Sequence, residues 1–387
     1  MKKIIYLFFI ICGTLFFSSE GCLEVEDTSN LEVVIDTSTL VLKGKYLATI
    51  GVCSACHTPP KVDDVLSANT EGYIEELQKR ANPDWVSYLD PDMEMAGGVP
   101  FILRFGPNLS GTVYTKNLTP DVETGLGSWT DEEIARAIKW GKRKDGTNLF
   151  LFAPHTFFKD IADDDVAALV AYLKSLKPVK NEILERELPF PTPDVTEVST
   201  LKNAPQGRTQ ERAKYLTHAL VGCAECHSYT KDGEINHFVG GDPIDPYIGV
   251  FRLGPDLPLR QDEKGFSAFP YPGYAVMYGG NLTKYGIGGP DSHISKHEIV
   301  KAMRQGISTQ TDEYNRPLPL AHIMMWQYYN KMSDDDAYAI AEYIKVLSYV
   351  PHDIGENLIL FGEDWEGAFE KVFGEEPSEN DKKIFGK

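Results

Sequence analysis

The chain has 387 residues, of which 42% are hydrophobic, so it is long enough for two or three domains that each bury a core. This composition excludes global disorder. The 57 Asp and Glu outnumber the 38 Lys and Arg, and the formal net charge of −19 argues against duplex nucleic acid as a ligand, because phosphate binding needs clustered cations. We therefore expect neutral or basic partners.

An apolar run, Ile4–Phe17, lies at the start of the chain behind two lysines. The run is short for a membrane span and is typical of an export signal. The small residues before Cys22 resemble the cleavage site of a bacterial lipoprotein, in which Cys22 would become the lipidated first residue. Glu20 is unusual in such a site, so ordinary secretion with an unmodified Cys22 is the alternative. Both alternatives predict an exported, periplasmic protein, and lipidation would anchor it to the membrane.

Four of the six cysteines form two copies of the pattern Cys-x-x-Cys-His, at Cys53–His57 and Cys223–His227. In this pattern both thiols bond to the vinyl groups of a porphyrin, and the histidine binds its iron. The residue counts predict about 0.002 such matches by chance. A redox dithiol is one alternative, and a zinc site shared by the four cysteines is another, but zinc would leave both histidines unexplained. We expect two covalently bound haem c groups, held by Cys53, Cys56, His57, Cys223, Cys226 and His227.

The chain repeats itself at an interval of about 170 residues. An amphipathic stretch precedes each motif, at Gly44–Leu47 and at Ala213–Leu216, with an offset of one residue between the copies. After the motifs, Asn117–Thr119 has its counterpart in Asn281–Thr283. Two tandem copies of one haem domain account for this repeat.

Two pairs of helices are predicted at corresponding places in the repeats. One pair begins at Thr130, followed by three acidic residues, and at Ser295, where Glu298 would complete a capping box. The other pair follows the acidic triplets Asp163–Asp165 and Asp334–Asp336. Apolar residues then recur every three to four positions, as in a buried stripe. These residues are Val166, Leu169, Val170 and Leu173 in the first copy and Ala337, Ile340, Ala341 and Ile344 in the second.

Strand signals are scarce, and long Gly/Pro-rich loops surround the few helices. That pattern suits a fold in which a large apolar cofactor replaces part of the core. In the acidic C-terminal extension, four aromatic residues at intervals of four predict a helix docked on a domain. They are Phe361, Trp365, Phe369 and Phe373. The predicted segments are a signal peptide (1–21), an acidic tether (22–39), domain one (40–178), a Pro-containing linker (179–206), domain two (207–350) and the extension (351–387).

The first domain resembles the class I cytochrome c domains of the multi-haem cytochrome c subunits of periplasmic alcohol, sorbitol and gluconate dehydrogenases. The resemblance is carried by the haem motif, Asn117–Asp121, Glu123–Gly127, Trp129 and Asp163–Leu169, in that order. The second domain is similar more loosely, so the resemblance covers most of residues 40–350. It implies an all-α fold of two tandem class I cytochrome c domains, and a role in passing electrons from a dehydrogenase towards a quinone or a terminal oxidase. Those subunits carry three haem motifs where this chain has two, which leaves the redox partner open.

The same resemblance implies a second iron ligand for the haem of domain two. In the related domains a methionine precedes the acidic triplet by ten residues, and this count reaches Met324. Met325 beside it is the alternative ligand. A thioether in this position raises the reduction potential of a haem. Either methionine could instead fill a gap in the haem pocket.

In domain one the same count reaches Ala153, which cannot bind iron. His155 follows two residues later and is one candidate ligand. Met93 and Met95 are alternatives, and an empty position is the third possibility. Two histidine ligands would make the first haem the lower-potential centre, so electrons would enter there and leave through the second haem.

These features predict an electron-transfer protein rather than an enzyme, and it could be a component of a dehydrogenase complex. It would relay electrons from an exported dehydrogenase or a quinol-side donor to a terminal acceptor. We expect a dehydrogenase, an oxidase or another cytochrome as the redox partner, and no catalytic residues, because no catalytic triad, phosphate loop or dinucleotide motif is present. The alternative is a dihaem peroxidase-like enzyme in which the second haem feeds an open first haem, and Ala153 is the feature that favours it.

Overall fold

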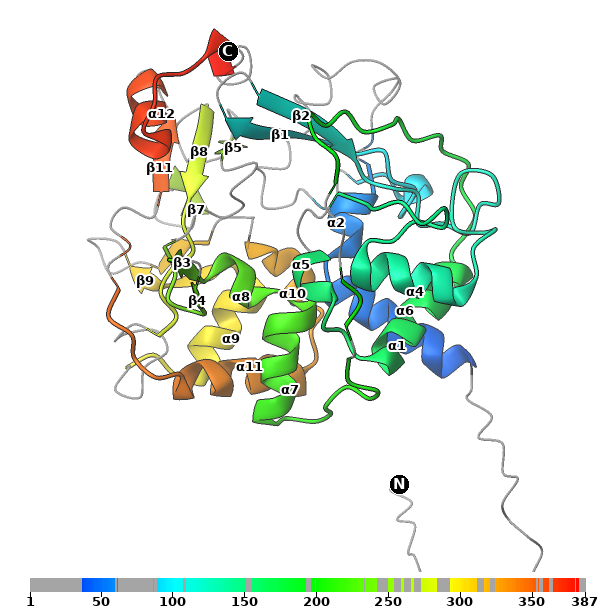
Figure 1. Ribbon diagram of the computed structural model, residues 1–387. Coiled ribbons are helices and arrows are strands. Elements are labelled where there is room, and N and C mark those ends of the chain that lie inside the picture. The colour runs from blue at the N-terminus through cyan, green and yellow to red at the C-terminus, as the bar shows by residue number, and fades with distance from the viewer. Residues whose placement is uncertain are drawn as a thin grey trace, which may run out of the picture. The chain divides into compact units, whose positions relative to one another are not determined.

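The helices of the two halves of the chain follow one order in the computed structural model (Figure 1). The first half, residues 37–178, contains α1 (Thr37–Ile50), α2 (Cys53–His57), the 3₁₀ turn η3 (Pro91–Met93), α4 (Asp131–Trp140), α5 (His155–Phe158) and α6 (Asp163–Ser175). The second half, residues 207–350, contains α7 (Gln210–Tyr215), the π-helical turn η4 (Leu216–Leu220), α8 (Cys223–Cys226), α9 (Lys296–Gln305), α10 (Trp326–Tyr329) and α11 (Asp334–Val346). The repeat in the sequence therefore extends to the order of the helices.

Residues 37–387 form one compact unit. The residues that the structure describes are 37–59, 61, 86, 89–106, 109–150, 155–192, 196–198, 200–232, 234–241, 250–253, 259–260, 266–267, 273–283, 293–311, 317–320, 324–352, 354, 358–361, 365–379 and 381–382. The predicted export signal and Cys22 lie outside these residues. Within them, every helix is too short or too polar to cross a lipid bilayer.

Capping boxes begin both α4 and α9. Thr130 accepts a hydrogen bond from the backbone N–H of Glu133, whose carboxylate accepts one from the N–H of Thr130. Ser295 and Glu298 make the same pair of bonds, which confirms the capping box predicted there. Each helix ends at a glycine with a φ of 61° or 66°, a left-handed conformation that suits a residue without a Cβ.

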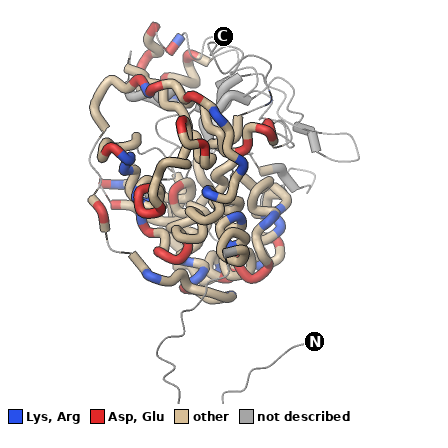
Figure 2. The backbone as a smooth tube through the Cα atoms, turned by 90° about the vertical axis from the view of Figure 1, so that its right-hand side faces the viewer, with Lys and Arg blue, Asp and Glu red and all other residues tan. Residues whose placement is uncertain are grey.

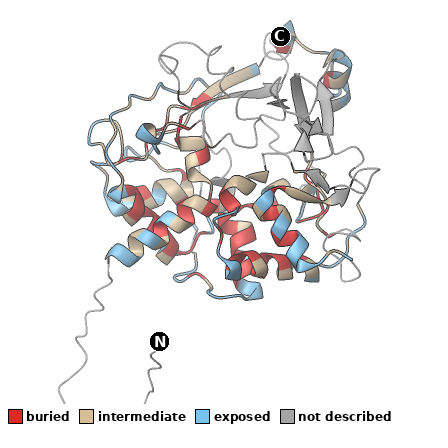
Figure 3. Cartoon of the chain, turned by 180° about the vertical axis from the view of Figure 1, so that it is seen from behind, coloured by how far each residue is buried: buried red, intermediate tan, exposed pale blue. Residues whose placement is uncertain are grey.

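The apolar stripes predicted for the last helix of each half form the core of the unit. All eight stripe residues are buried, and Figure 3 shows buried positions where the helices pack together. In the first half α1 runs along α6, and a Cβ on Gly44 would overlap the carbonyl oxygen of Ala168. The core is continuous between the halves, because Leu47 and Leu169 belong to the same cluster as Leu216 and Ile340.

The one-residue offset between the repeats is taken up by the turn η4. In the first half the N–H of Gly51 bonds to the carbonyl of Leu47, four residues earlier. In the second half the N–H of Val221 bonds to the carbonyl of Leu216, five residues earlier. A π-helical turn holds one extra residue, so both helices deliver the chain to the haem motif in the same way.

Short antiparallel strands occupy parts of the loops, and the all-α expectation did not include them. The pairs are β1 (Pro100–Gly106) with β2 (Leu109–Tyr114), β3 (Tyr229–Lys231) with β4 (Glu234–Asn236), β6 (Leu259–Arg260) with β7 (Phe266–Ser267), and β9 (Ile307–Thr311) with β10 (Pro317–Pro319). A three-stranded sheet has the order β11 (Leu358–Phe361), β8 (Gly273–Met277), β5 (Val250–Leu253). Long loops must satisfy their backbone hydrogen bonds, and short strand pairs do so without the long alternating pattern that marks a strand in sequence.

The segment between the halves follows the first half closely. Glu187 exchanges two backbone hydrogen bonds of 2.8 Å with Thr112, and the N–H of Asp163 bonds to the carbonyl of Leu201. In the C-terminal extension the predicted helix is present as α12 (Trp365–Phe373), and Phe369 is fully buried. Phe361, which we had assigned to the same helix, lies in β11, so the aromatic spacing predicted the start of the helix one turn too early.

Candidate functional site

Each Cys-x-x-Cys-His motif forms a single helical turn. Helix α2 comprises the first motif, and α8 comprises the two cysteines and intervening residues of the second. Residues three and four apart lie on the same side of a helix, so such a turn presents both thiols and the imidazole in one direction. The residue before each turn, Val52 or Gly222, has a left-handed φ of 53° or 72° and redirects the chain into the motif. None of the four cysteines is in a disulfide.

Backbone carbonyls fix the tautomer of both motif histidines. The Nδ1 atom of His57 lies 2.7 Å from the carbonyl oxygen of Lys116, and Nδ1 of His227 lies 2.8 Å from that of Gly280. A carbonyl oxygen can only accept, so Nδ1 carries the proton and Nε2 presents its lone pair. Burial also lowers the pKa of His227, which favours the neutral imidazole. This is the form in which a histidine binds iron while its other nitrogen is held by a second group.

Glycines bring the carbonyl-bearing loops against the motifs. The N–H of Gly97 bonds to the carbonyl of His57 at 2.8 Å, and the N–H of Gly240 bonds to that of His227 at 2.9 Å. Both glycines have a left-handed φ, of 72° and 70°. A Cβ on Gly97 would lie 2.5 Å from the carbonyl carbon and oxygen of Lys116, the group that holds His57. A side chain at this position would therefore displace the histidine's partner.

The repeated Asn-Leu-Thr segments support these loops. The side chain of Asn117 accepts from the N–H and hydroxyl of Thr119, at 2.9 and 2.8 Å, and donates to the carbonyl of Val179. Asn281 makes the equivalent bonds to Thr283 and to the carbonyl of Val350. The sequence repeat had marked these segments without giving their role. Each holds the residue just before it, whose carbonyl binds the motif histidine.

The surroundings of the thiols suit an apolar cofactor. Burial raises the pKa of the Cys53 and Cys223 thiols to about 12, so both sulfurs lie in a poorly solvated position. Among the described residues, no three His, Cys, Asp or Glu side chains gather in a way that could hold a metal ion. The two motifs therefore do not meet in the shared zinc site that was one alternative.

A buried polar group near Lys116, whose carbonyl holds His57, lacks a partner that a haem could supply. In the described part of the chain, Nη2 of Arg143 makes no hydrogen bond, although it lies 3.9 Å from a carboxylate oxygen of Glu185. Desolvation, and then the charge of Arg143, lower the pKa of the Lys116 amine. Two carboxylates, such as the propionates of a haem, would satisfy buried donors of this kind. The residues present thus fit a haem c group bound through the first motif.

The methionine candidates of the second half lie side by side before α10. Met324 packs against the main core. Met325 has a left-handed φ of 54° and also packs against a small cluster formed by Ala55, Leu89 and Tyr328. Because Ala55 belongs to the first motif and Tyr328 to α10, this small cluster contains residues of both halves.

The candidates for the first haem differ in their surroundings. Met95 is 2% exposed and has a left-handed φ of 61°. Its carbonyl accepts a hydrogen bond from the N–H of Leu118. In the second half the carbonyl of Phe238, which is equally buried, accepts one from the N–H of Leu282. Met93 is half-buried in η3. His155 begins α5, but its side chain is outside the described residues, as is all of Ala153. Met95 therefore occupies a packing position that an aromatic residue fills in the other half.

No protein-family model matches the chain. It is 24% identical over 362 residues to the gluconate 2-dehydrogenase cytochrome c subunit of Pantoea cypripedii, covering 90% of this chain and 65% of that one. It is 24% identical over 345 residues to the cytochrome c subunit of the quinone-linked alcohol dehydrogenase of Gluconobacter oxydans, covering 82% and 56%. A diheme c-type cytochrome of Cereibacter sphaeroides is 26% identical over 148 residues, covering 35% and 50%.

The chain thus spans between 50% and 65% of the length of these three relatives. Their names confirm the resemblance to multi-haem cytochrome c subunits of dehydrogenases that the motif order had indicated. The largely helical structure of the chain agrees with a cytochrome fold. Together, the relatives and the paired motif turns support an electron-transfer cytochrome with covalently bound haem c.

Proposed function

We propose that this chain is a dihaem c-type cytochrome built from two tandem haem domains, residues 40–178 and 207–350. It relays electrons between an exported dehydrogenase or a quinol-side donor and a terminal acceptor. One haem c is bound through Cys53, Cys56 and His57, and the other through Cys223, Cys226 and His227. A haem c supplies an iron that accepts and releases one electron, and the chain supplies its attachment, its axial ligands and its surroundings.

The observation that carries this proposal is the matched environment of the two motif histidines. In each half the Nδ1–H faces a backbone carbonyl, from Lys116 or Gly280, directly before an Asn-Leu-Thr segment. A chance Cys-x-x-Cys-His sequence has no reason to present its imidazole in the iron-binding tautomer, and still less to do so twice. The matched environment therefore supports two working haem sites.

The axial ligands give the relay its direction. Met324 is the proposed second ligand of the haem in the second half, with Met325 as the alternative, and a thioether there raises the potential. His155 is the proposed second ligand of the first haem, with Met93 and Met95 as alternatives. Electrons would then enter at the first haem and leave from the second.

Export completes the proposal. The apolar run Ile4–Phe17 would direct the chain across the membrane, and Cys22 would carry the lipid that anchors it on the periplasmic side. The gluconate and alcohol dehydrogenase cytochrome subunits to which the chain is similar suggest a dehydrogenase as the electron donor.

Redox titration and carbon monoxide binding test the ligand assignment. In holoprotein, Met324→Ala should lower the potential of one haem and open it to carbon monoxide, and His155→Ala should open the other haem. Met325→Ala is the comparison for Met324→Ala. If Met325→Ala opens the second haem to carbon monoxide and Met324→Ala does not, Met325 is the sixth ligand. If the wild type already binds carbon monoxide and turns over peroxide, the peroxidase-like alternative replaces the relay. That alternative rests on Ala153, outside the described residues.

A further inference from the structure

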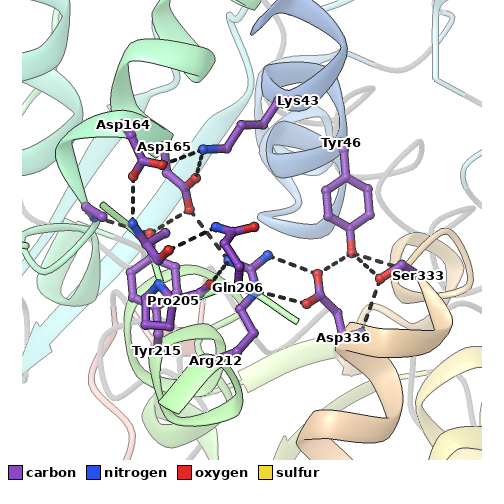
Figure 4. Close-up of polar contacts among 12 residues, drawn as sticks. Lys43, Tyr46, Asp164, Asp165, Pro205, Gln206, Arg212, Tyr215, Ser333 and Asp336 are labelled. Carbon is purple, nitrogen blue, oxygen red and sulfur yellow. Dashed lines mark hydrogen bonds and ion pairs between the residues drawn. The ribbon is translucent and has the colours of Figure 1, made fainter. Parts of the chain in front are cut away.

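The helix that precedes each haem motif is bonded to the last helix of the other half. The hydroxyl of Tyr46, on α1, donates to Asp336 at 2.6 Å and accepts from the N–H of Ser333 at 3.1 Å. The hydroxyl of Tyr215, on α7, donates to Asp165 at 2.8 Å and accepts from the N–H of Ala162 at 3.2 Å. Figure 4 shows both tyrosines with their carboxylates.

These two contacts are equivalent positions of the repeat. Tyr46 and Tyr215 stand at the same place in the stretches Gly44–Leu47 and Ala213–Leu216. Asp165 and Asp336 are each the third residue of an acidic triplet. Each half therefore gives one tyrosine to the other half and receives one in return, so the contact is reciprocal.

A cation from its own half holds each of the two carboxylates. Nζ of Lys43 lies 2.7 Å from Asp165, and the guanidinium of Arg212 donates to both oxygens of Asp336, at 2.8 and 3.0 Å. Asp165 is fully buried, and Asp336 is 5% exposed. A buried carboxylate needs both its ion pair and its remaining hydrogen bonds, so loss of either tyrosine hydroxyl leaves a poorly satisfied charge inside the interface.

A second set of contacts joins the haem-binding turns themselves. The hydroxyls of Ser54, inside the first motif, and Tyr328 lie 2.9 Å apart. The next residue, Tyr329, donates to the carbonyl of Val221, two residues before the second motif, at 3.2 Å. Both tyrosines are buried. Two adjacent side chains thus connect one motif with the entry to the other.

We infer that Tyr46 and Tyr215 are positioning residues that fix the two haem-binding turns relative to each other. Only two residues separate α1 from the first motif, and η4 leads from α7 to the second, so rotation of one half against the other would move both turns. The reciprocal pair of bonds opposes that rotation at two points. The inference rests on the proposed function, because a fixed spacing matters when electrons pass between two irons.

Dipolar electron paramagnetic resonance on oxidised holoprotein measures the spacing between the irons directly. The test variant is Tyr46→Phe/Tyr215→Phe, which removes two hydroxyls and keeps both rings. The matched control is Tyr338→Phe, because this tyrosine lies on α11, the helix that carries Asp336, but its hydroxyl bonds to His297 within the same half. We expect a single narrow distance distribution in the wild type and the control, and a broad or divided distribution in the double variant.

A double variant that holds both haems and keeps the wild-type distribution overturns the inference. A merely stabilising role would lower the unfolding temperature of the variant and leave the distribution in its folded fraction unchanged. Should the double variant fail to load haem, the single variant Tyr46→Phe gives the same comparison with the Tyr215 bond intact. Absence of haem from the wild type would instead refute the proposed function. Haem absorbance measures the haem content separately from the distance measurement.

Discussion

Two backbone carbonyls, rather than side chains, set the chemistry of the motif histidines. Because Lys116 contributes its carbonyl, and Gly280 has no side chain at all, no residue type at these positions marks them in the sequence. The nearest signal is the Asn-Leu-Thr segment that follows each of them. At the scale of single residues, the attachment groups could be predicted from the motif, whereas the groups that orient them became visible only in the structure.

Gly97→Ala should impair haem binding at the first motif through two effects. The substitution costs about 1 to 2 kcal/mol for the left-handed backbone, and its Cβ also pushes on the carbonyl of Lys116. We expect incomplete haem loading at the first motif and a lower unfolding temperature, measured by absorbance and by calorimetry.

Gly146→Ala is the matched control for this prediction. Gly146 also has a left-handed φ, of 82°, but nothing lies within 4 Å of its Cβ position. The control should carry the backbone cost alone and load haem normally. Equal effects of the two substitutions would show that contact with the Lys116 carbonyl does not matter.

At the scale of elements, local signals predicted the helices well. Both last helices have their predicted stripes buried, and the capping box at Ser295 is present, because caps and stripes depend on residues close in sequence. The short strand pairs were missed, since strands of two to seven residues are too short to show a sustained alternation of apolar and polar residues. The π-helical turn η4 was visible only as an offset of one residue between the repeats.

Deletion of one residue from η4 tests that explanation of the offset. Removal of His218 gives the second half the spacing of the first, so we expect a regular α-helical turn and normal haem loading at the second motif. Removal of Thr49 from α1 is the control, because it rotates the regular helix against the first motif and should abolish loading there. Haem content per chain measures both outcomes, and equal losses would contradict the explanation.

The contact between Tyr46 and Asp336 should weaken at alkaline pH. Burial, and then the hydrogen bond to Asp336, raise the pKa of Tyr46 from 10.0 to about 12. Tyr46 has a higher pKa in the folded protein than in the unfolded chain, where it is about 10. Its contribution to stability is therefore complete below pH 10 and is lost as the pH rises from 10 to 12. Denaturant unfolding between pH 8 and 12 should therefore show a smaller decline in Tyr46→Phe than in the wild type. Parallel curves for the two proteins would contradict this assignment.

At the scale of the whole molecule, the halves share one core and a reciprocal set of polar contacts. Tyr46 and Asp336 are 290 residues apart in the chain, so no local pattern could predict their bond. The net charge of −19 also gives no hint of it, and in Figure 2 acidic and basic residues occur near one another along the described chain. The repeat explains why the two contacts are equivalent, because both tyrosines and both carboxylates occupy corresponding positions.

The central claim is that each half of the chain binds one haem covalently through its motif. Mass spectrometry of mature protein from cells able to attach haem c, together with haem absorbance, measures this most directly. We predict a mass increase of two haem groups per chain in the wild type and of one in the variant Cys223→Ala/Cys226→Ala. A colourless protein with the mass of the bare polypeptide would contradict the account.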